Sequence, residues 1–525
     1  MELSCVRQTL IPGTSKLFAD FLYSYDKVSA YYPLHFSDEG ALVRAAGQVR
    51  FPESRRSQIV EALRTQNGDS AALAKLAQPG TVAVVTGQQV GLFSGPAYTV
   101  FKALTAAALA AELTAQGVPA VPIFWLATED HDVDEVSHAW VFDQDATPRE
   151  LHVKPTGSIG GPVGDLKLAD VPLTELRTAL GELPFADEVL QKVAAAYHSG
   201  NTLGEAFRQL IQDLLAGFDL LFLDPLRPEI REICAPFLSD VAGRAADVTA
   251  SLRTRSQDLE AAGYHAQVHI ENDASLLFLL SEDRRIPLKW KDGRFVTKER
   301  SYTPAEVQSM GRQLSPNALL RPVMQDYLLP TVSYVGGPAE IAYLAQSEVL
   351  YDKLLGRMPV IFPRKSFTLL DGRATKLIGK YGITLTDLLD YQELVKSRLA
   401  SKLVPDHLAE GFVSLRSNAS SALARLESSL SEFDPTLSAA AHKSGAKILY
   451  QIEKLSQKTA RETMRRDRYA EKDAAYLSNL VYPKRHLQER MYSIIPFLAK
   501  HGLDLPQRLY AEMQLACPDH MVRSF

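Results

Sequence analysis

Short runs of apolar residues recur along the first 380 residues, and turn residues follow each run. They lie at 82–85, 120–126, 218–224, 328–335 and 360–363. Continuous apolar runs of this length, bounded by turns, are typical of strands that are buried on both faces of a parallel sheet. Helical patterns lie between several of these runs. The chain is therefore predicted to have an α/β fold.

The first strand leads into a glycine-rich loop and a long helical pattern. Gly87, Gly91 and Gly95 lie in the loop, Pro96 suits the first helical position, and Gly117 suits the position just after the helix. Gly95 is the expected N-cap. A strand, a glycine loop and a helix together direct backbone N–H groups at an anion, often a phosphate. Neither common phosphate-loop motif is present, and an ordinary βα turn explains the glycines equally well.

Three polar side chains lie in or near this loop. Gln88 and Gln89 supply amide groups in the turn, which suits a neutral or hydroxyl-rich ligand. Lys102 lies two turns into the helix, so its ammonium group can reach back toward the loop. We expect all three side chains to contact a ligand.

Ionisable side chains cluster where the second strand ends. The cluster comprises Glu129, Asp130, His131, Asp132, Asp134, Glu135 and His138. Open α/β sheets bind ligands at the carboxyl ends of their strands. If 131–138 is helical, His131, Glu135 and His138 share one face. Three interpretations stay open: a general acid–base histidine with orienting carboxylates, a divalent metal site, and a solvated loop that caps a helix.

A second strand–glycine–helix unit lies around residue 336. Its candidate ligand-binding residues are Asn317, Arg321, Gly336, Gly337 and Glu340. Two such turns on one sheet can flank a cleft at a topological switch point. Arg321 is either a clamp for a carboxylate or phosphate, or the partner of Asp326 or Glu340 in a structural ion pair.

Arg364 and Lys376 lie in a basic stretch that follows the last strand. These cations either cover a polyphosphate or belong to a solvated helix start.

The hydrophobic pattern also predicts the order of the domains. Residues 1–80 form a helical segment packed on the core, and 81–380 form the core with β-rich insertions near 139–200 and 260–300. Residues 381–480 form a helical hairpin, and 481–525 form a helical tail. Apolar residues between 408 and 426 step by four and three, which is a heptad seam, and Pro435 separates this helix from a second one. The seam is rich in alanine, so we expect a homodimer through 400–476.

Composition and charge exclude several classes of protein. The net charge of the 525 residues is −5, which does not favour nucleic acid, although Arg461, Arg465, Arg466 and Arg468 form a basic patch of unassigned role. No signal peptide or membrane-spanning run is evident. The three cysteines lie far apart and suggest neither a disulfide framework nor a zinc site, which fits the cytoplasm.

Three long motifs resemble one family. They are VVTGQQVGLFSGPAYTVFKA at 84–103, PIFWLATEDHDVDEVSH at 122–138 and SPNALLRPVMQDYLLPTVSYVGGPAEIAYLAQ at 315–346. In this order they resemble the bacillithiol biosynthesis cysteine-adding enzymes. The resemblance implies a Rossmann-like core similar to class I aminoacyl-tRNA synthetases, with inserted connecting subdomains and a C-terminal coiled coil that dimerises. It also implies a ligase that joins cysteine to glucosaminyl-malate through an amide bond.

Two departures limit what the resemblance implies. Residues 482–486 read YPKRH where family members often carry an Asn-Gly turn, so the local turn there is in doubt. The HxGH motif of the synthetases is absent, so their adenylate chemistry cannot be transferred. The energy donor stays open, with ATP or another nucleotide as a candidate.

The residues and the resemblance together give a working hypothesis. The loop at 87–95 and the helix that follows hold anionic groups. His131 or His138 takes the proton of the attacking amine, while Glu129 and Asp130 bind the ammonium or orient the histidine. No metal is assigned. The rivals are a metal-dependent phosphohydrolase that uses Asp130, His131, Asp132 and His138, and a non-catalytic scaffold built on the coiled coil.

Overall fold

A parallel five-stranded sheet forms the centre of the computed structural model, which describes residues 4–157, 160–281, 284–467 and 469–525. Its strands are β2 (Val82–Gln88), β3 (Ala120–Leu126), β8 (Leu221–Leu223), β14 (Thr331–Gly336) and β15 (Val360–Pro363). The spatial order is β15-β14-β2-β3-β8. The chain therefore builds outward from β2 in one direction and then returns to the other side. This is the doubly wound order, with its switch point between β2 and β14.

All five predicted strands are present, and the α/β prediction is confirmed. The third is shorter than the apolar run at 218–224 because only Leu221–Leu223 pairs with β3. Helices α5 (Tyr98–Ala115) and α14 (Pro338–Leu355) pack against the sheet, α5 on β2 and β3 and α14 on β14 and β15. Gly87 has to be glycine where β2 lies beside β3, since a Cβ there would lie 2.9 Å from the Trp125 carbonyl oxygen of β3.

Helix α5 starts later than the glycine pattern predicts. Its N-cap is Ala97, and Gly95 instead adopts φ +62° and ψ −161° ahead of the helix. Pro96 pairs with Ser493, and the Ala97 N–H donates to the Tyr492 carbonyl at 2.7 Å. The C-terminal part of the chain thus fixes the approach to the helix, so the assignment of Gly95 as N-cap is wrong.

Helices also form much of the N-terminal segment and of the chain between β8 and β14. The N-terminal segment forms α1 (Lys16–Tyr23), α2 (Ala41–Gln48), α3 (Glu53–Asn67) and α4 (Ala71–Leu76). Between β8 and β14 lie α10 (Pro228–Gly243), α11 (Ala245–Ala261), α12 (Pro304–Ser309) and α13 (Arg321–Leu328). The N-terminal segment is helical as predicted, apart from the short strand β1 (Ser4–Val6).

The insertion near 139–200 is less β-rich than expected. Two antiparallel pairs, β4 (His138–Phe142) with β5 (Pro148–His152) and β6 (Lys154–Thr156) with β7 (Lys167–Asp170), come first. Helices α7 (Leu173–Leu180), α8 (Ala186–Ala196) and α9 (Leu203–Leu214) follow. The glycine-rich sequence GSIGGPVG at 157–164 predicts a turn in this insertion, and residues 158–159 of it lie outside the described residues.

The insertion near 260–300 is a β excursion, as predicted. Strands β9 (Ala274–Leu280), β10 (Arg285–Lys291), β11 (Arg294–Val296) and β12 (Ser301–Tyr302) join β13 (Leu314–Pro316) in an antiparallel sheet. Asp292 and Gly293 both have positive φ, 49° and 75°. They form the tight β10–β11 hairpin that the Asp-Gly pair predicts.

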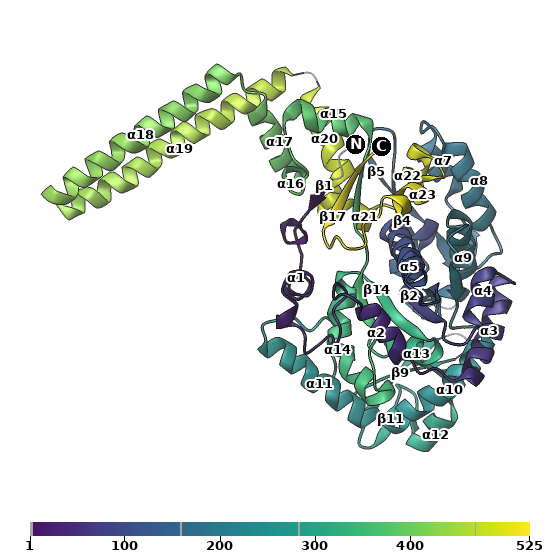
Figure 1. Ribbon diagram of the computed structural model, residues 1–525. Helices are drawn as coiled ribbons and strands as arrows, with labels where there is room; N and C mark the ends of the chain where they lie inside the picture. The colour runs from purple at the N-terminus through teal and green to yellow at the C-terminus, as the bar shows by residue number, and fades with distance from the viewer. Residues whose placement is uncertain (1–3, 158–159, 282–283, 468) are drawn as a thin grey trace.

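The tail contains a strand as well as helices, which corrects the purely helical prediction for 481–525. After α20 (Ala470–Val481) come α21 (Gln488–Met491), α22 (Ile495–His501) and α23 (Leu505–Ala511), and then β17 (His520–Ser524). This last strand lies between β1 and β16 (Phe367–Leu370). The two ends of the chain therefore meet in one small sheet (Figure 1).

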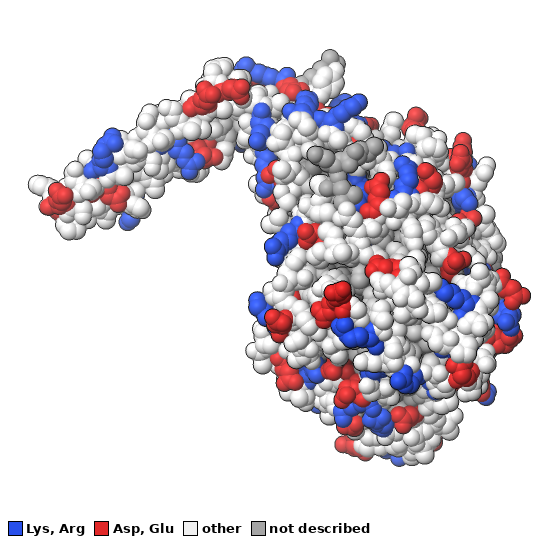
Figure 2. All heavy atoms as spheres, in the orientation of Figure 1, with Lys and Arg blue, Asp and Glu red and all other residues white. Residues whose placement is uncertain are grey.

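The predicted helical hairpin projects from the rest of the molecule (Figure 1). It consists of α18 (Asp406–Phe433) and α19 (Pro435–Arg466), and it is preceded by α15 (Gly372–Tyr381), α16 (Leu385–Leu388) and α17 (Gln392–Lys402). Charges of both signs are interspersed over the face drawn in Figure 2. Within the predicted basic patch, Arg465 and Arg466 both pair with Glu462, and Arg468 lies outside the described residues. No helix in the described ranges is both long enough and apolar enough to cross a membrane.

Candidate active site

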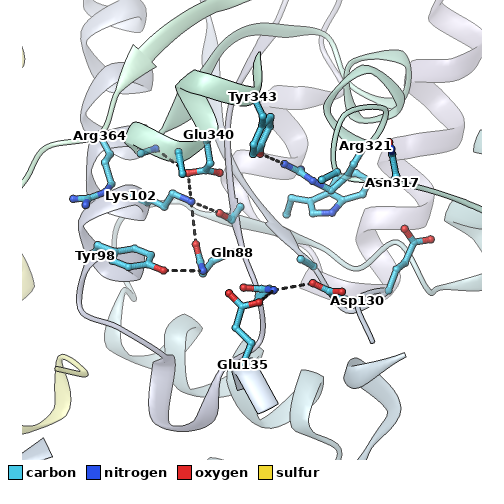
Figure 3. Close-up of a pocket in the computed structure, with 18 of the residues that line it drawn as sticks. Gln88, Tyr98, Lys102, Asp130, Glu135, Asn317, Arg321, Glu340, Tyr343 and Arg364 are labelled. Atoms are coloured by element: carbon cyan, nitrogen blue, oxygen red, sulfur yellow. Dashed lines mark hydrogen bonds and ion pairs between the residues drawn. The ribbon is translucent and has the colours of Figure 1, made fainter. Parts of the chain in front are cut away.

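A pocket of about 360 Å³ lies at the carboxyl ends of β2 and β14, which is the switch point of the sheet. Its lining includes these predicted residues: Gly87, Gln88, Gln89, Lys102, Glu129, Asp130, Asn317, Arg321, Gly337, Glu340 and Arg364. Figure 3 shows Tyr98, Lys102 and Arg364 on one side, Asn317 and Arg321 on the other, and Asp130 and Glu135 between the two sides and below them. All three sequence motifs, at 84–103, 122–138 and 315–346, thus contribute side chains to one cleft.

Lys102 and Glu340 form a buried ion pair that joins the two halves of the pocket. The Lys102 ammonium lies 2.5 Å from a Glu340 carboxylate oxygen and donates to the Gly87 carbonyl at 2.7 Å. Burial alone would raise the pKa of Glu340, but Lys102 and the Gly337 N–H outweigh it, so the pKa lies below its usual value. Glu340 also accepts from the Tyr334 hydroxyl at 2.6 Å. The pair fixes β2 against the start of α14.

Gln89 connects two carboxylates at the lower edge of the pocket. Its amide nitrogen donates to Asp130 at 2.7 Å and to Glu135 at 2.6 Å. Burial would raise the pKa of Asp130, but the hydrogen bonds from Gln89 and the His131 N–H lower it overall. The pKa of Glu135 is raised, chiefly by burial and then by the nearby negative charges of Asp130 and Asp132. Asp130 is thus the better anion, and Glu135 is the better proton acceptor near neutral pH.

Glu129 plays a different part from that expected. It is buried and paired with Arg231, whose guanidinium also donates to the Arg312 carbonyl at 2.9 Å. Burial raises the pKa of Glu129 although Arg231 lies beside it. Its carboxylate therefore ties the floor of the pocket to α10.

His131 lies just outside the pocket, behind Asp130. Its Nδ1 is 3.4 Å from an Asp130 carboxylate oxygen and 3.3 Å from an Arg285 guanidinium nitrogen, and its side chain is 45% exposed. Arg285 itself lines the pocket and lies 3.6 Å from the same Asp130 oxygen. The polar contacts of the His131 side chain with the pocket lining thus go to Asp130 and Arg285.

Arg321 and Asn317 form the opposite wall. Arg321 donates to the Tyr343 hydroxyl at 2.9 Å and to the Tyr334 hydroxyl at 3.2 Å. Neither Asp326 nor Glu340 forms a salt bridge with it among the described residues, so the structural ion pair considered from the sequence does not form. Asn317 lines the pocket, and its side-chain oxygen accepts from the N–H groups of Leu319 and Leu320.

Arg364 is buried rather than solvated. It donates to Glu489 at 2.6 Å, and its guanidinium carbon lies 5.0 Å from the centre of the Tyr98 ring. Lys365, the next cation, faces away and donates to the Leu515 and Cys517 carbonyls. Lys376 is exposed on α15 and does not line the pocket.

Three of the predicted glycines, Gly91, Gly95 and Gly336, and the predicted His138 lie outside the pocket lining. Gly91 and Gly95 pack against each other, since a Cβ on Gly91 would lie 3.0 Å from the Gly95 Cα. Gly336 faces Tyr334 and Glu340 rather than the pocket. His138 begins β4, and its Nδ1 bonds the Asp134 carbonyl at 2.8 Å.

The predicted helical face at 131–138 does not form. Asp132 caps α6 (Val133–Val136), a single turn, and the chain then enters β4. Asp130, His131, Asp132 and His138 consequently do not converge. Among the described residues no three His, Cys, Asp or Glu side chains are placed to hold a metal ion. The phosphohydrolase alternative has no support.

The lining residues to which the sequence assigned no role include Tyr98, Glu135, Arg285 and Arg490. Tyr98 and Glu135 lie within the motifs, and the position of Glu135 in the acidic cluster was a usable signal. Arg285 and Arg490 come from the β insertion and the C-terminal part. Only the tertiary fold brings them to the pocket.

Comparison with known proteins matches both parts of the chain. The family model described as "Bacillithiol biosynthesis BshC, N-terminal Rossmann-like domain" covers residues 1–365, and the one described as "Bacillithiol biosynthesis BshC, C-terminal coiled-coil domain" covers 367–525. A protein of Solibacter usitatus named "Putative cysteine ligase BshC" is 50% identical over 522 residues, which is 99% of each chain. A protein with the same name from Koribacter versatilis is 34% identical over 99% of each chain. Another, from Salinibacter ruber, is 31% identical over 96% of this chain and 95% of the relative.

Proposed function

Because this chain belongs to the bacillithiol biosynthesis BshC family, we propose that it is a ligase that joins cysteine to the amine of glucosaminyl-malate. The observation that carries the proposal is the charged pocket at the switch point, which combines carboxylates for an ammonium group with guanidinium groups for carboxylates. Cysteine and glucosaminyl-malate each carry an amine and at least one carboxylate.

The reaction makes one C–N bond. The sugar nitrogen attacks the carbonyl carbon of an activated cysteine carboxylate, and the bond from that carbon to the leaving group breaks. The amine arrives as an ammonium ion, so it must first lose a proton to a nearby base. The activating co-substrate is open, and ATP or another nucleotide is a candidate.

We assign this step to the two carboxylates that accept hydrogen bonds from Gln89. Asp130, whose pKa is lowered, is the anion that binds the substrate ammonium. Glu135, whose pKa is raised, takes the proton. Gln89 orients both groups, at 2.7 Å and 2.6 Å. His131 is the rival base, because it lies 3.4 Å from Asp130.

The first residues of helix α14 form part of the pocket lining. Gly337, Pro338 and Ala339 line the cavity at the start of this 18-residue helix. The partial positive charge of a helix N-terminus favours an anion there. We propose that α14, with Arg321, receives an anionic group of the activated substrate or of its co-substrate.

Assembly as a homodimer through the hairpin is supported by its exposed apolar side chains. Helix α18 buries none of its residues within the chain, and Leu415 and Leu426 are 48% and 54% exposed. On α19, Ile448 and Leu455 are 46% and 54% exposed. A second copy would cover this surface with the same surface of its own. The proposed setting is the cytoplasm, where low-molecular-weight thiols are made.

The assignment of the base is tested in an extract of a strain that lacks the gene, because such an extract supplies the energy donor. Purified variants are added with cysteine and glucosaminyl-malate, and bacillithiol is measured by mass spectrometry. Glu135→Gln should lower the rate by about 10²- to 10⁴-fold. Asp134→Asn, an exposed neighbour outside the pocket lining, is the matched control.

His131→Asn separates the two candidate bases. If Glu135 is the base, the His131 variant should keep its rate within about tenfold of the wild type, since His131 reaches the pocket through Asp130 and Arg285. A full loss in His131→Asn with near-normal turnover in Glu135→Gln would transfer the role to the histidine.

A further inference from the structure

The pocket crosses the boundary between the two parts of the chain. Its lining comes from residues 87–364 with one exception, Arg490, which lies in helix α21 within the coiled-coil part. This part therefore contributes a side chain directly to the candidate active site.

Buried hydrogen bonds fix α21 in place. The Gln488 side chain accepts from the Leu369 N–H at 2.7 Å and donates to the Leu369 carbonyl at 2.9 Å. Glu489, which is 1% exposed, accepts from the Ser366 hydroxyl at 2.8 Å and from the Phe367 N–H at 2.9 Å. These contacts anchor α21 to β16 and to Ser366, the residue just before it. The backbone of α21 thus holds Arg490 at the pocket.

The other cations of the pocket are already committed to acceptors within the protein. Lys102 is paired with Glu340, Arg364 with Glu489 and Arg285 with Asp130. Arg321 donates to two tyrosine hydroxyls. Among the described residues, the Arg490 guanidinium has no hydrogen bond or ion pair, although it lines the cavity. Its five N–H donors are available to a ligand.

A guanidinium recognises a carboxylate through two parallel hydrogen bonds. The guanidinium carbon of Arg490 lies 5.9 Å from the centre of the Tyr98 ring, and that of Arg364 lies 5.0 Å from it. Figure 3 shows Tyr98 and Arg364 together on one side of the pocket. An anion placed beside the Tyr98 ring would therefore lie near two guanidinium groups, those of Arg490 and Arg364.

We propose that Arg490, Tyr98 and Arg364 form a carboxylate subsite, and that Arg490 is the specificity-determining residue that binds the carboxylate. The inference rests on the proposed function, which supplies two sources of a carboxylate: the malate half of the sugar substrate and cysteine. The malate half, with two carboxylates, is the source that an arginine pair suits better. The coiled-coil part then completes the active site in addition to any role in assembly.

The test is calorimetric titration of the full-length protein with glucosaminyl-malate, with glucosamine and with cysteine. Arg490→Met should weaken binding of glucosaminyl-malate by about 10- to 100-fold, which is the effect of losing hydrogen bonds to a charged group. Glucosamine binding should not change. Arg490→Lys should restore part of the affinity, because it restores the charge without the fork of donors.

Arg485→Met is the matched control. Arg485 is an exposed arginine five residues earlier, stacked on Tyr391 and outside the pocket lining. Its variant should bind all three ligands like the wild type, and the melting temperatures of all variants report on folding. A weakening confined to cysteine would retain the subsite and assign it to the amino acid.

Equal affinity of Arg490→Met and wild type for both carboxylate ligands would overturn the inference while the proposed function stands. A wild-type protein that binds neither glucosaminyl-malate nor cysteine would overturn the proposed function, and the subsite with it.

Discussion

Replacement of Lys102 by methionine should destabilise the protein through the charge that it leaves behind. The Lys102 side chain is 2% exposed, and its ammonium satisfies Glu340, the Gly87 carbonyl and the Gln88 side chain at 2.5, 2.7 and 3.0 Å. Methionine fills a similar volume without a charge. Glu340 would keep its hydrogen bonds from Tyr334 and Gly337 but lose its only cation at contact distance among the described residues.

The expected cost follows from the burial of the pair. Removing one partner of a buried ion pair typically costs about 3–5 kcal/mol, since the other charge stays buried and uncompensated. In the wild type the pKa of Glu340 is lowered, so its contribution to stability is present above the pKa of the unfolded chain and is lost as pH falls through the folded value. In Lys102→Met, burial should raise the pKa of Glu340, and protonation should then relieve the cost.

Urea unfolding at pH 7.5 and pH 5, followed by tryptophan fluorescence, measures both effects. The difference in unfolding free energy between wild type and Lys102→Met should be several kcal/mol at pH 7.5 and clearly smaller at pH 5. The double variant Lys102→Met/Glu340→Gln should be more stable than Lys102→Met at pH 7.5. A difference that is independent of pH, or a double variant less stable than the single one, would refute the reasoning.

Three further predictions address other parts of the chain. Burial lowers the pKa of His520 to about 4, so the folded state binds this proton less readily than the unfolded chain does. The free energy of unfolding should therefore fall by about 2 kcal/mol from pH 7.5 to pH 5. In thermal melts, His520→Gln should remove this contribution to the pH dependence and leave the similar contribution of His501. Gly95→Val should lower the free energy of unfolding by about 1–3 kcal/mol because φ +62° with ψ −161° suits only glycine. The folded fraction should still bind glucosaminyl-malate, since Gly95 does not line the pocket. Loss of this binding in calorimetry would contradict the prediction. Replacing 406–466 by a short Gly-Ser linker should give a monomer in light scattering, and a truncated protein that stays dimeric would disprove dimerisation through the hairpin.

The sheet and its ligand-binding edge could be predicted from local sequence. Buried parallel strands have to be continuously apolar, and the turns at Gly87 and Gly337 stand out because backbone and side chains approach closely there. Gln89, Asp130 and Glu340 follow those strands directly, so the position of the strand ends was enough to place them at one edge.

Other parts of the site depend on contacts that no local pattern encodes. Gly95-Pro96 reads as a helix start, but its pairing with Ser493, about 400 residues away, delays α5. The face expected from His131 to His138 fails because β4 pairs with β5 and leaves room for only one helical turn. Arg490 reaches the pocket because Gln488 and Glu489 bind β16, over 100 residues earlier. Long-range pairing decided each of these cases.

The central claim is that this pocket adds cysteine to glucosaminyl-malate. The most direct measurement is the level of both thiol and precursor in a strain from which the gene is deleted, determined by mass spectrometry. The account predicts that bacillithiol disappears and glucosaminyl-malate accumulates, that the wild-type gene reverses both changes, and that a Glu135→Gln gene does not. Bacillithiol at its normal level in the deletion strain, with no accumulation of glucosaminyl-malate, would contradict the claim.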